Sequence, residues 1–203
     1  MTPFLVGIAG GSGSGKSTFC RQLADKLNGH IEIIQHDNYY VDQSHLAIEQ
    51  SNRLNFDHPD SLESTLLLTQ LQSLRNGQSI EMPTYDFATH SRTTVTQTIL
   101  PVPIILVDGI LLFADNALAD VFDLRIFIHT AEDERLRRRI KRDQARRGRT
   151  RESVVTQWRS TVQTMFIEFV APTQNRAHLV VPMDRPNPTA VETVSRALRS
   201  RCN

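Results

Sequence analysis

Cysteine and long apolar runs are both scarce in this 203-residue chain. The two cysteines, Cys20 and Cys202, have neither metal-ligand spacing nor an evident shared partner, so we expect two free thiols. The first apolar run is too short for a signal peptide or a membrane span, and we expect a cytoplasmic protein with no membrane partner. With 39% hydrophobic residues, the chain can bury one core, which predicts a single domain over residues 1–203.

Excess charge of one sign is also lacking, because the net charge is only +1. The positive charge is nevertheless concentrated: residues 135–151 hold nine Arg and one Lys against a single acid, Asp143. A nucleic-acid-binding protein would spread basic residues over a face, so we expect no nucleic-acid partner. A local block favours a polyphosphate ligand, because guanidinium groups make strong bidentate hydrogen bonds with phosphate.

A glycine-rich loop follows the apolar run at residues 4–9 and precedes a helix-like segment. It matches G-x-x-x-x-G-K-[ST] in the context that this motif needs. In such a loop the backbone N–H groups bind phosphate oxygens, the lysine binds the β- and γ-phosphates, and the next hydroxyl ligates Mg²⁺. The loop therefore predicts a nucleoside triphosphate site with Ser17 as a metal ligand. Its residues are Gly10, Gly11, Ser12, Gly13, Ser14, Gly15, Lys16, Ser17 and Thr18.

Strand-like and helix-like segments alternate along the chain, which predicts an α/β fold of the P-loop NTPase type, with a parallel sheet flanked by helices. Residues 79–100 contain two further strand-like runs and predict a β-hairpin insertion on the substrate side. We expect strands at 4–9, 31–36, 104–107 and 124–129, with a weaker one at 177–181. We expect helices at 16–28, 61–75, 132–147, 151–170 and 189–201.

Two carboxylates come directly after predicted strands: Asp37 after 31–36, and Asp108 after 104–107. Ligands of open α/β sheets gather at the carboxyl ends of strands. We expect Asp108 to bind Mg²⁺ directly or through water, with an ordinary helix cap as the alternative. Asp37 could accept a proton from a substrate hydroxyl that attacks the γ-phosphate, although its spacing alone leaves that role open.

The arginine block has helical spacing. Its residues Arg135, Arg138, Arg139 and Arg142 share one helix face, and Gly148 breaks the pattern. This predicts a lid over about residues 132–150 that closes on phosphates and stabilises phosphoryl transfer. The alternative is a solvated, charged helix.

Together these segments resemble the uridine–cytidine kinase family, close to phosphoribulokinase-like kinases, from the first strand to about residue 182. The resemblance implies an enzyme that uses ATP or GTP with Mg²⁺ to phosphorylate the 5′-hydroxyl of uridine or cytidine. It also implies a homo-oligomer, commonly a tetramer. Beyond the glycine-rich loop and the arginine block, it is carried by DNYY at 37–40, NFDHPD at 55–60, PTYDFATHSR at 83–92, DGIL at 108–111 and FVAPT at 169–173.

The resemblance implies a role for several individual residues. Asp37 would be the general base, with Lys16 and Arg142 also catalytic, and Asp57 would accept hydrogen bonds from the ribose 2′- and 3′-hydroxyls. His90 would bond the base edge, because a neutral imidazole can present a donor or an acceptor by changing tautomer. Nucleoside-binding roles would also fall to Tyr40, Tyr85, Phe87, Arg139 and Gln157, and triphosphate-binding roles to Arg142 and Arg147. The alternatives are hairpin core for Phe87 and an ordinary surface histidine for His90.

Two other functions stay open at this point. One is a related kinase for another small alcohol, such as nicotinamide riboside, pantothenate or ribulose 5-phosphate; Tyr85, Phe87 and His90 count against it. The other is a catalytically silent nucleotide-binding regulator, against which the intact Lys16 and Asp37 argue. One departure bears on the metal: the family usually has Glu where this chain has Asp108, and the shorter side chain favours contact through water.

Overall fold

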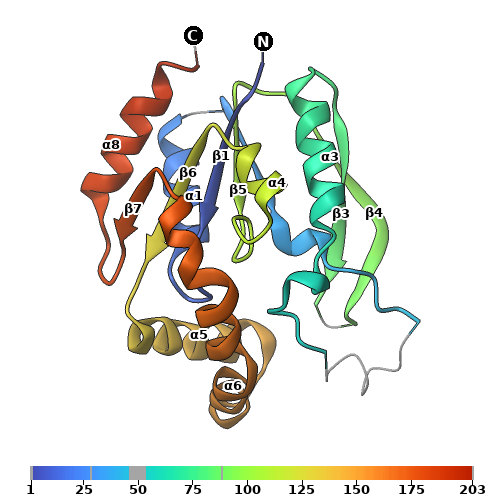
Figure 1. Ribbon diagram of the computed structural model, residues 1–203, viewed down its shortest axis with the longest axis vertical. Coiled ribbons are helices and arrows are strands. Elements are labelled where there is room, and N and C mark those ends of the chain that lie inside the picture. Colours follow the sequence, from blue (N-terminus) through green and yellow to red (C-terminus); the bar gives the residue numbers. More distant parts are fainter. Residues whose placement is uncertain (1, 28, 46–53, 88, 203) are drawn as a thin grey trace.

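A five-stranded parallel sheet forms the centre of the computed structural model (Figure 1). Residues 2–27, 29–45, 54–87 and 89–202 are described here. The strand order is β2-β5-β1-β6-β7, and each neighbouring pair is parallel. The predicted α/β fold is thus confirmed. The strands are β1 (Phe4–Ala9), β2 (Ile31–Gln35), β5 (Ile104–Asp108), β6 (Leu124–His129) and β7 (Leu179–Pro182).

Helices cover both faces of this sheet, because successive residues of a strand point to opposite sides. In β1, Val6 and Ile8 pack with α1 (Lys16–Leu27) and α8 (Pro188–Arg199). Leu5 points the other way, into a second core that includes α3 (Ser64–Arg75) and α4 (Asn116–Asp120). The sheet therefore separates two apolar cores. The core with Val6 and Ile8 includes residues of α1, the helix that follows the glycine-rich loop.

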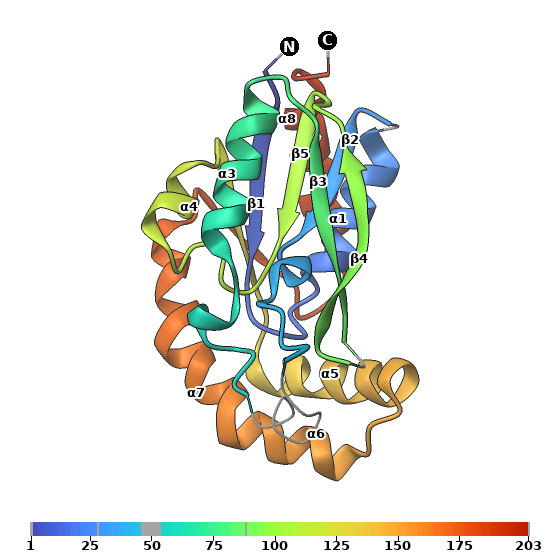
Figure 2. The ribbon, with the colours of Figure 1, turned by 90° about the vertical axis from the view of Figure 1, so that its right-hand side faces the viewer.

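The expected hairpin forms a separate antiparallel sheet of β3 (Ile80–Asp86) and β4 (Ser91–Ile99). Its strands are longer than the sequence indicated, since β3 continues through Pro83. The proline is tolerated because the pairing register shifts between Pro83 and Tyr85, as at a β-bulge. Figure 2 shows the hairpin running alongside the main sheet toward α5 (Glu132–Arg147).

Other elements also differ from expectation. The helix expected from residue 61 begins at Ser64, because Pro59–Ser61 forms a 3-10 turn and Leu62 pairs with Tyr40. The strand expected to residue 36 ends at Gln35, before a 3-10 turn at His36–Tyr39. The short helix α4 had no periodic signal. The helix expected over 151–170 consists of α6 (Arg151–Gln157), a π turn (Trp158–Val162), α7 (Gln163–Met165) and a second π turn (Phe166–Val170).

Both cysteines are free thiols, as expected: Cys20 is buried in α1 and Cys202 is half-buried. None of the helices in the described part of the chain combines the length and the apolar character that a membrane crossing requires.

Candidate functional site

The glycine-rich loop joins β1 to α1 at the carboxyl end of the sheet. Gly13 has a φ of +78°, and a Cβ atom there would lie 2.2 Å from the carbonyl oxygen of Arg135. Only glycine fits this contact, which holds the loop against α5. Lys16 Nζ donates to the Gly11 carbonyl at 3.1 Å, and Ser17 and Thr18 are exposed on the first turn of α1. A glycine-rich loop at a helix N-terminus is the arrangement that binds anions in other proteins.

Asp108 ends β5, which pairs with β1, and its Oδ2 accepts a hydrogen bond from Ser17 Oγ. The other oxygen, Oδ1, is buried without a hydrogen-bond partner among the described residues. A hydroxyl and a carboxylate oxygen fit Mg²⁺, which usually takes one or two carboxylates and completes its shell with water and phosphate oxygens. The helix-cap alternative for Asp108 is wrong, because Asp115 caps the next helix, α4.

Asp37 lies in the 3-10 turn that follows β2, and β2 is the strand that pairs with β5. Desolvation, followed by the Asp108 carboxylate, raises the pKa of Asp37, while Lys16 is the largest opposing influence. Desolvation lowers the pKa of Lys16, which Asp108 and Asp37 partly offset. The three charges therefore lie close enough to perturb one another. A carboxylate with a raised pKa is a better proton acceptor than an ordinary aspartate.

Aromatic rings gather beside Asp37. Tyr40 lies 5.3 Å from Tyr85 and 6.3 Å from Phe87 between ring centroids, and Tyr85 lies 5.3 Å from Phe87. Phe87 is 40% exposed, so its alternative as hairpin core is wrong. Desolvation, followed by the Asp37 and Asp57 carboxylates, raises the pKa of Tyr40, which places its hydroxyl near both acids. The rings thus form an apolar wall between two carboxylates.

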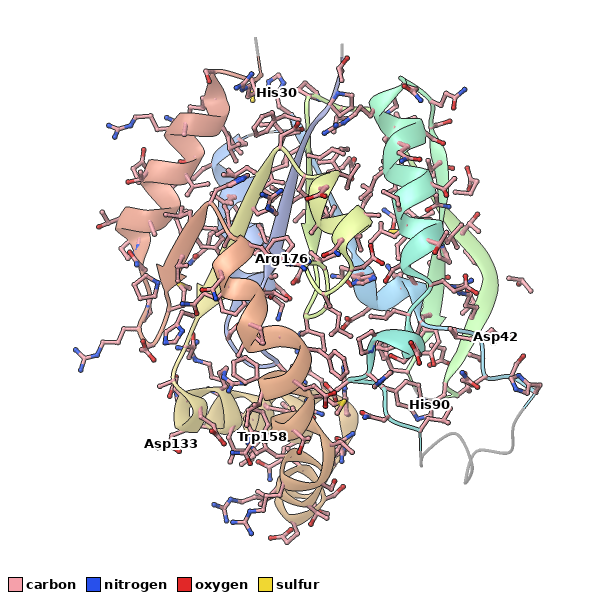
Figure 3. All side chains as sticks on the ribbon, viewed as in Figure 1. His30, Asp42, His90, Asp133, Trp158 and Arg176 are labelled. Atoms are coloured by element: carbon pink, nitrogen blue, oxygen red, sulfur yellow. The ribbon has the colours of Figure 1, made fainter. Side chains whose placement is uncertain are left out.

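His90 lies between β3 and β4 of the hairpin (Figure 3), and its carbonyl oxygen accepts a hydrogen bond from the Gln43 N–H at 3.3 Å. Its ring stacks on Phe56 with centroids 4.6 Å apart and 13° between planes. Its φ of +52° is left-handed, a conformation that costs energy for a non-glycine residue and is common at functional sites. Desolvation, followed by Arg147, lowers the pKa of His90 and favours neutral imidazole. Phe56 was not predicted as a site residue, although it lies inside the NFDHPD segment.

Asp57 is 9% exposed and lines a small cavity together with Gly11, Ser12 and Phe166. Burial raises the pKa of Asp57, while Arg139 is the largest opposing influence. This carboxylate, which the sequence places far from the glycine-rich loop, is therefore brought next to it.

Arg139 and Gln157 are in direct contact. Arg139 Nη2 donates to Gln157 Oε1 at 2.9 Å, and its Nη1 donates to Ser12 Oγ of the loop at 3.0 Å. Arg149 Nη1 also donates to Gln157 Oε1, at 2.6 Å. Arg149 was not predicted as a site residue, although it stands directly after Gly148, which breaks the arginine block. The amide of Gln157 thus joins two guanidinium groups.

Arg142 and Arg147 lie on the exposed side of α5, with side chains 37% and 38% exposed. The Arg147 guanidinium carbon lies 5.2 Å from the centre of the Phe87 ring. This contact connects the end of α5 to the hairpin. The structure therefore brings Arg147, one of the two predicted triphosphate arginines, to the end of the aromatic wall.

The expected common face of four arginines is only partly free for a ligand. Arg135 is 3% exposed, 3.7 Å from the Phe166 ring and 5.2 Å from the Trp158 ring, with Trp158 seen beside α5 in Figure 3. Arg138 donates to the carbonyl oxygens of Ser14 and Met183. These two arginines hold α5 against the glycine-rich loop because the helix packs on it directly.

Comparison with known proteins agrees with this arrangement. Residues 5–190 match the Phosphoribulokinase / Uridine kinase family. A uridine kinase from Chloroflexus aggregans is 43% identical over 193 residues, covering 95% of this chain and 92% of that protein. A uridine kinase from Limosilactobacillus reuteri is 38% identical over 198 residues, covering 97% and 91%. Phosphoribulokinase from Rhodobacter spheroides shares the fold, with a TM-score of 0.68 and 15% identity over 89% of this chain and 70% of that one. The chain therefore belongs to the phosphoribulokinase/uridine kinase family.

Proposed function

We propose that this protein is a uridine kinase, which transfers the γ-phosphoryl group of ATP or GTP to the 5′-hydroxyl of uridine or cytidine and yields UMP or CMP. The observation that carries the proposal is the place of Asp37 in the turn after β2, where Lys16 of the glycine-rich loop influences its pKa and where desolvation and its own charge raise the pKa of Tyr40 in the aromatic wall. A base between a phosphate loop and an aromatic wall suits an alcohol attached to a ring. Two relatives named uridine kinase, 38% and 43% identical over nearly the whole chain, support the same substrate class.

In this proposal the triphosphate binds the glycine-rich loop, whose N–H groups and Lys16 take the phosphate oxygens. Ser17 and Asp108 would hold Mg²⁺, which when bound neutralises charge on the β- and γ-phosphates. Asp37 accepts the proton of the 5′-hydroxyl as its oxygen attacks the γ-phosphorus and the bond to the leaving diphosphate breaks. Arg142 and Arg147 offset the negative charge of the transferring group, because both guanidiniums are accessible from the site.

The nucleoside would lie between the aromatic wall and the arginine helix. Asp57 would accept from the two ribose hydroxyls, with Arg139 and Gln157 closing the other side, since the three are neighbours. Phe87 and Tyr85 would pack on the pyrimidine, and His90 would bond its edge as neutral imidazole. Pantothenate and ribulose 5-phosphate carry no base and could not make these contacts with Phe87, Tyr85 and His90.

The first test is MgATP-dependent ADP release with uridine, cytidine, adenosine, nicotinamide riboside, pantothenate and ribulose 5-phosphate. Turnover confined to uridine and cytidine supports the proposal; activity only with another alcohol refutes the pyrimidine site but keeps the phosphoryl-transfer machinery. MgGTP in place of MgATP tests the donor. The tetramer implied by the family resemblance stays a prediction, which a mass measurement in solution checks.

Asp37→Asn tests the base. We expect kcat to fall by about 10²- to 10⁴-fold, because the amide cannot accept the hydroxyl proton. The matched control is Asp60→Asn, the same change at a side chain that is 92% exposed in the turn before α3. Near-wild-type turnover of Asp37→Asn would show that another group accepts the proton.

A further inference from the structure

The acid inside the arginine block is fully buried. Asp143 is 0% exposed on α5, and four guanidinium groups surround its carboxylate. We call them the arginine cluster. Its members, with their nitrogen–oxygen distances to Asp143, are Arg142 (2.8 Å), Arg139 (3.6 Å), Arg149 (3.7 Å) and Arg147 (4.0 Å). One negative charge thus lies among four positive ones.

The arginine cluster reaches two different parts of the site. Arg139 and Arg149 both donate to Gln157, on the side where the nucleoside is proposed to bind. Arg142 and Arg147, which are proposed to bind the triphosphate, are each more than a third exposed. Two members connect the parts directly, because Arg139 also donates to Ser12 of the glycine-rich loop and Arg147 also contacts the Phe87 ring. Asp143 is the group that all four share. Any displacement of its carboxylate therefore moves both parts together.

The backbone reinforces this role of Asp143. Its carbonyl oxygen accepts from the N–H groups of Gly148 and Arg149, the latter at 3.3 Å. Gly148, with a φ of +61°, ends α5 in a left-handed turn. This turn reverses the chain and brings Arg149 back to the carboxylate of a residue six positions earlier. The main chain and side chain of Asp143 therefore place the same arginine.

Four guanidiniums that all lie within 4.0 Å of one carboxylate repel one another, and this repulsion is strong where water is excluded. One carboxylate reduces this repulsion without neutralising the cluster, which keeps a net positive charge for an anionic ligand. Arg142 is held by a directed hydrogen bond to this carboxylate, and the attraction of the same negative charge holds the other three guanidiniums at 3.6–4.0 Å. Removal of the charge would leave an anion-binding surface that is more positive but less ordered.

We propose that Asp143 is a positioning residue of the kinase, which holds the arginine cluster in the one arrangement that serves nucleoside and triphosphate at the same time. Asp143 touches neither substrate in this proposal, which rests on the proposed function. It leads to an unusual expectation: loss of the Asp143 charge lowers turnover while affinity for a polyphosphate anion is kept or increased. A purely structural residue would lower both together.

The experiment compares Asp143→Asn with Asp133→Asn, the same change at an exposed position of the same helix (Figure 3). Both variants gain one unit of positive charge. Four quantities are measured: kcat, the KM for uridine and for MgATP, the Kd for inorganic tripolyphosphate, and the melting temperature. For Asp143→Asn we expect kcat at least about tenfold lower and a raised KM for uridine, because the arrangement that serves both substrates is lost, while the KM for MgATP and the tripolyphosphate Kd stay equal to or below those of the wild type. Asp133→Asn should match the wild type in kcat.

A kcat of Asp143→Asn within twofold of wild type would overturn the proposal, as would a parallel loss of turnover and tripolyphosphate binding in a folded protein. If Asp143→Asn does not fold, Asp143→Glu is tested in its place. It keeps the charge but displaces the guanidiniums by one methylene, so kcat should fall while tripolyphosphate binding persists. Failure of both variants to fold would overturn the proposal in favour of a structural role. The substrate panel on the wild type separately decides the proposed function. If another alcohol is the substrate, kcat and KM of the variants are measured with that alcohol and compared with the wild type in the same way.

Discussion

Acidification should destabilise this protein through His36, the residue directly before the proposed base. His36 is 0% exposed, and its Cβ lies only 2.6 Å from where a Cβ on Gly109 would be. Burial lowers the pKa of His36 to about 3, from an ordinary value of 6.5. The folded state therefore keeps a neutral imidazole in the turn that bears Asp37, packed against Gly109, the residue after Asp108.

The sign follows from proton linkage. The pKa of His36 is lower in the folded state, so the unfolded chain binds the proton first, and stability is full above about pH 6.5 and falls below it toward about pH 3. At about pH 5.5 the unfolded form with a pKa of 6.5 is mostly protonated and the folded form is not, which lowers the free energy of unfolding by about 1.4 kcal/mol. For a chain of this size that corresponds to a melting temperature lower by about 3 to 6 °C.

The assay is thermal unfolding from pH 8 to pH 5.5 for the wild type, His36→Gln and His30→Gln. His30 is an exposed histidine at the opposite end of the sheet (Figure 3), so its variant should follow the wild-type curve. His36→Gln should lose about 3 to 6 °C less than the wild type over this interval, whatever its own starting stability. Parallel curves for wild type and His36→Gln would refute the reasoning, as would an NMR titration of His36 with a midpoint above pH 6 in the folded protein.

Two other substitutions separate stability from binding. Gly13→Ala should abolish MgATP binding in a calorimetric titration and lower the free energy of unfolding by at least about 1–3 kcal/mol, because the φ of +78° and the contact with the Arg135 carbonyl both disfavour a side chain; unchanged affinity would contradict this. Asp57→Asn should raise the KM for uridine about tenfold or more while leaving the melting temperature at pH 7 equal or higher, because burial raises the pKa of Asp57 and its ionised form therefore opposes folding above the unfolded pKa. Uridine and 2′-deoxyuridine should then be used more equally, and an unchanged ratio of their kcat/KM values would argue against a ribose contact.

The sequence predicted well what depends on local periodicity. The strand, glycine-rich loop and helix at residues 4–27 occur where the apolar pattern and the motif place them. Asp108 next to Ser17 also follows, since the carboxyl ends of neighbouring parallel strands lie side by side. These features need only short-range patterns and the general rules of α/β sheets.

Features that depend on packing between distant segments could not be predicted in this way. Helical spacing put Arg135 on a ligand-binding face, yet Phe166 and Trp158, which contact it, come from a segment more than 20 residues away. The continuation of β3 through Pro83 depends on a register shift that no local pattern encodes. Asp143 stands out in the sequence as the single acid in the arginine block, but its complete burial among the arginines could not be predicted from that pattern.

The two π turns change the directions in which side chains point along the helical segment that follows α6. In a regular α-helix, each residue turns by about 100°, so Trp158 and Phe166 would point about 80° apart. A π turn takes more residues per turn, which reduces that rotation and returns both rings to one side. They can therefore contact the same guanidinium, that of Arg135, from a single continuous helical segment. The π turn at Trp158–Val162 thus lets a spacing of eight residues act like the spacing of seven that puts two side chains on one face of a regular helix.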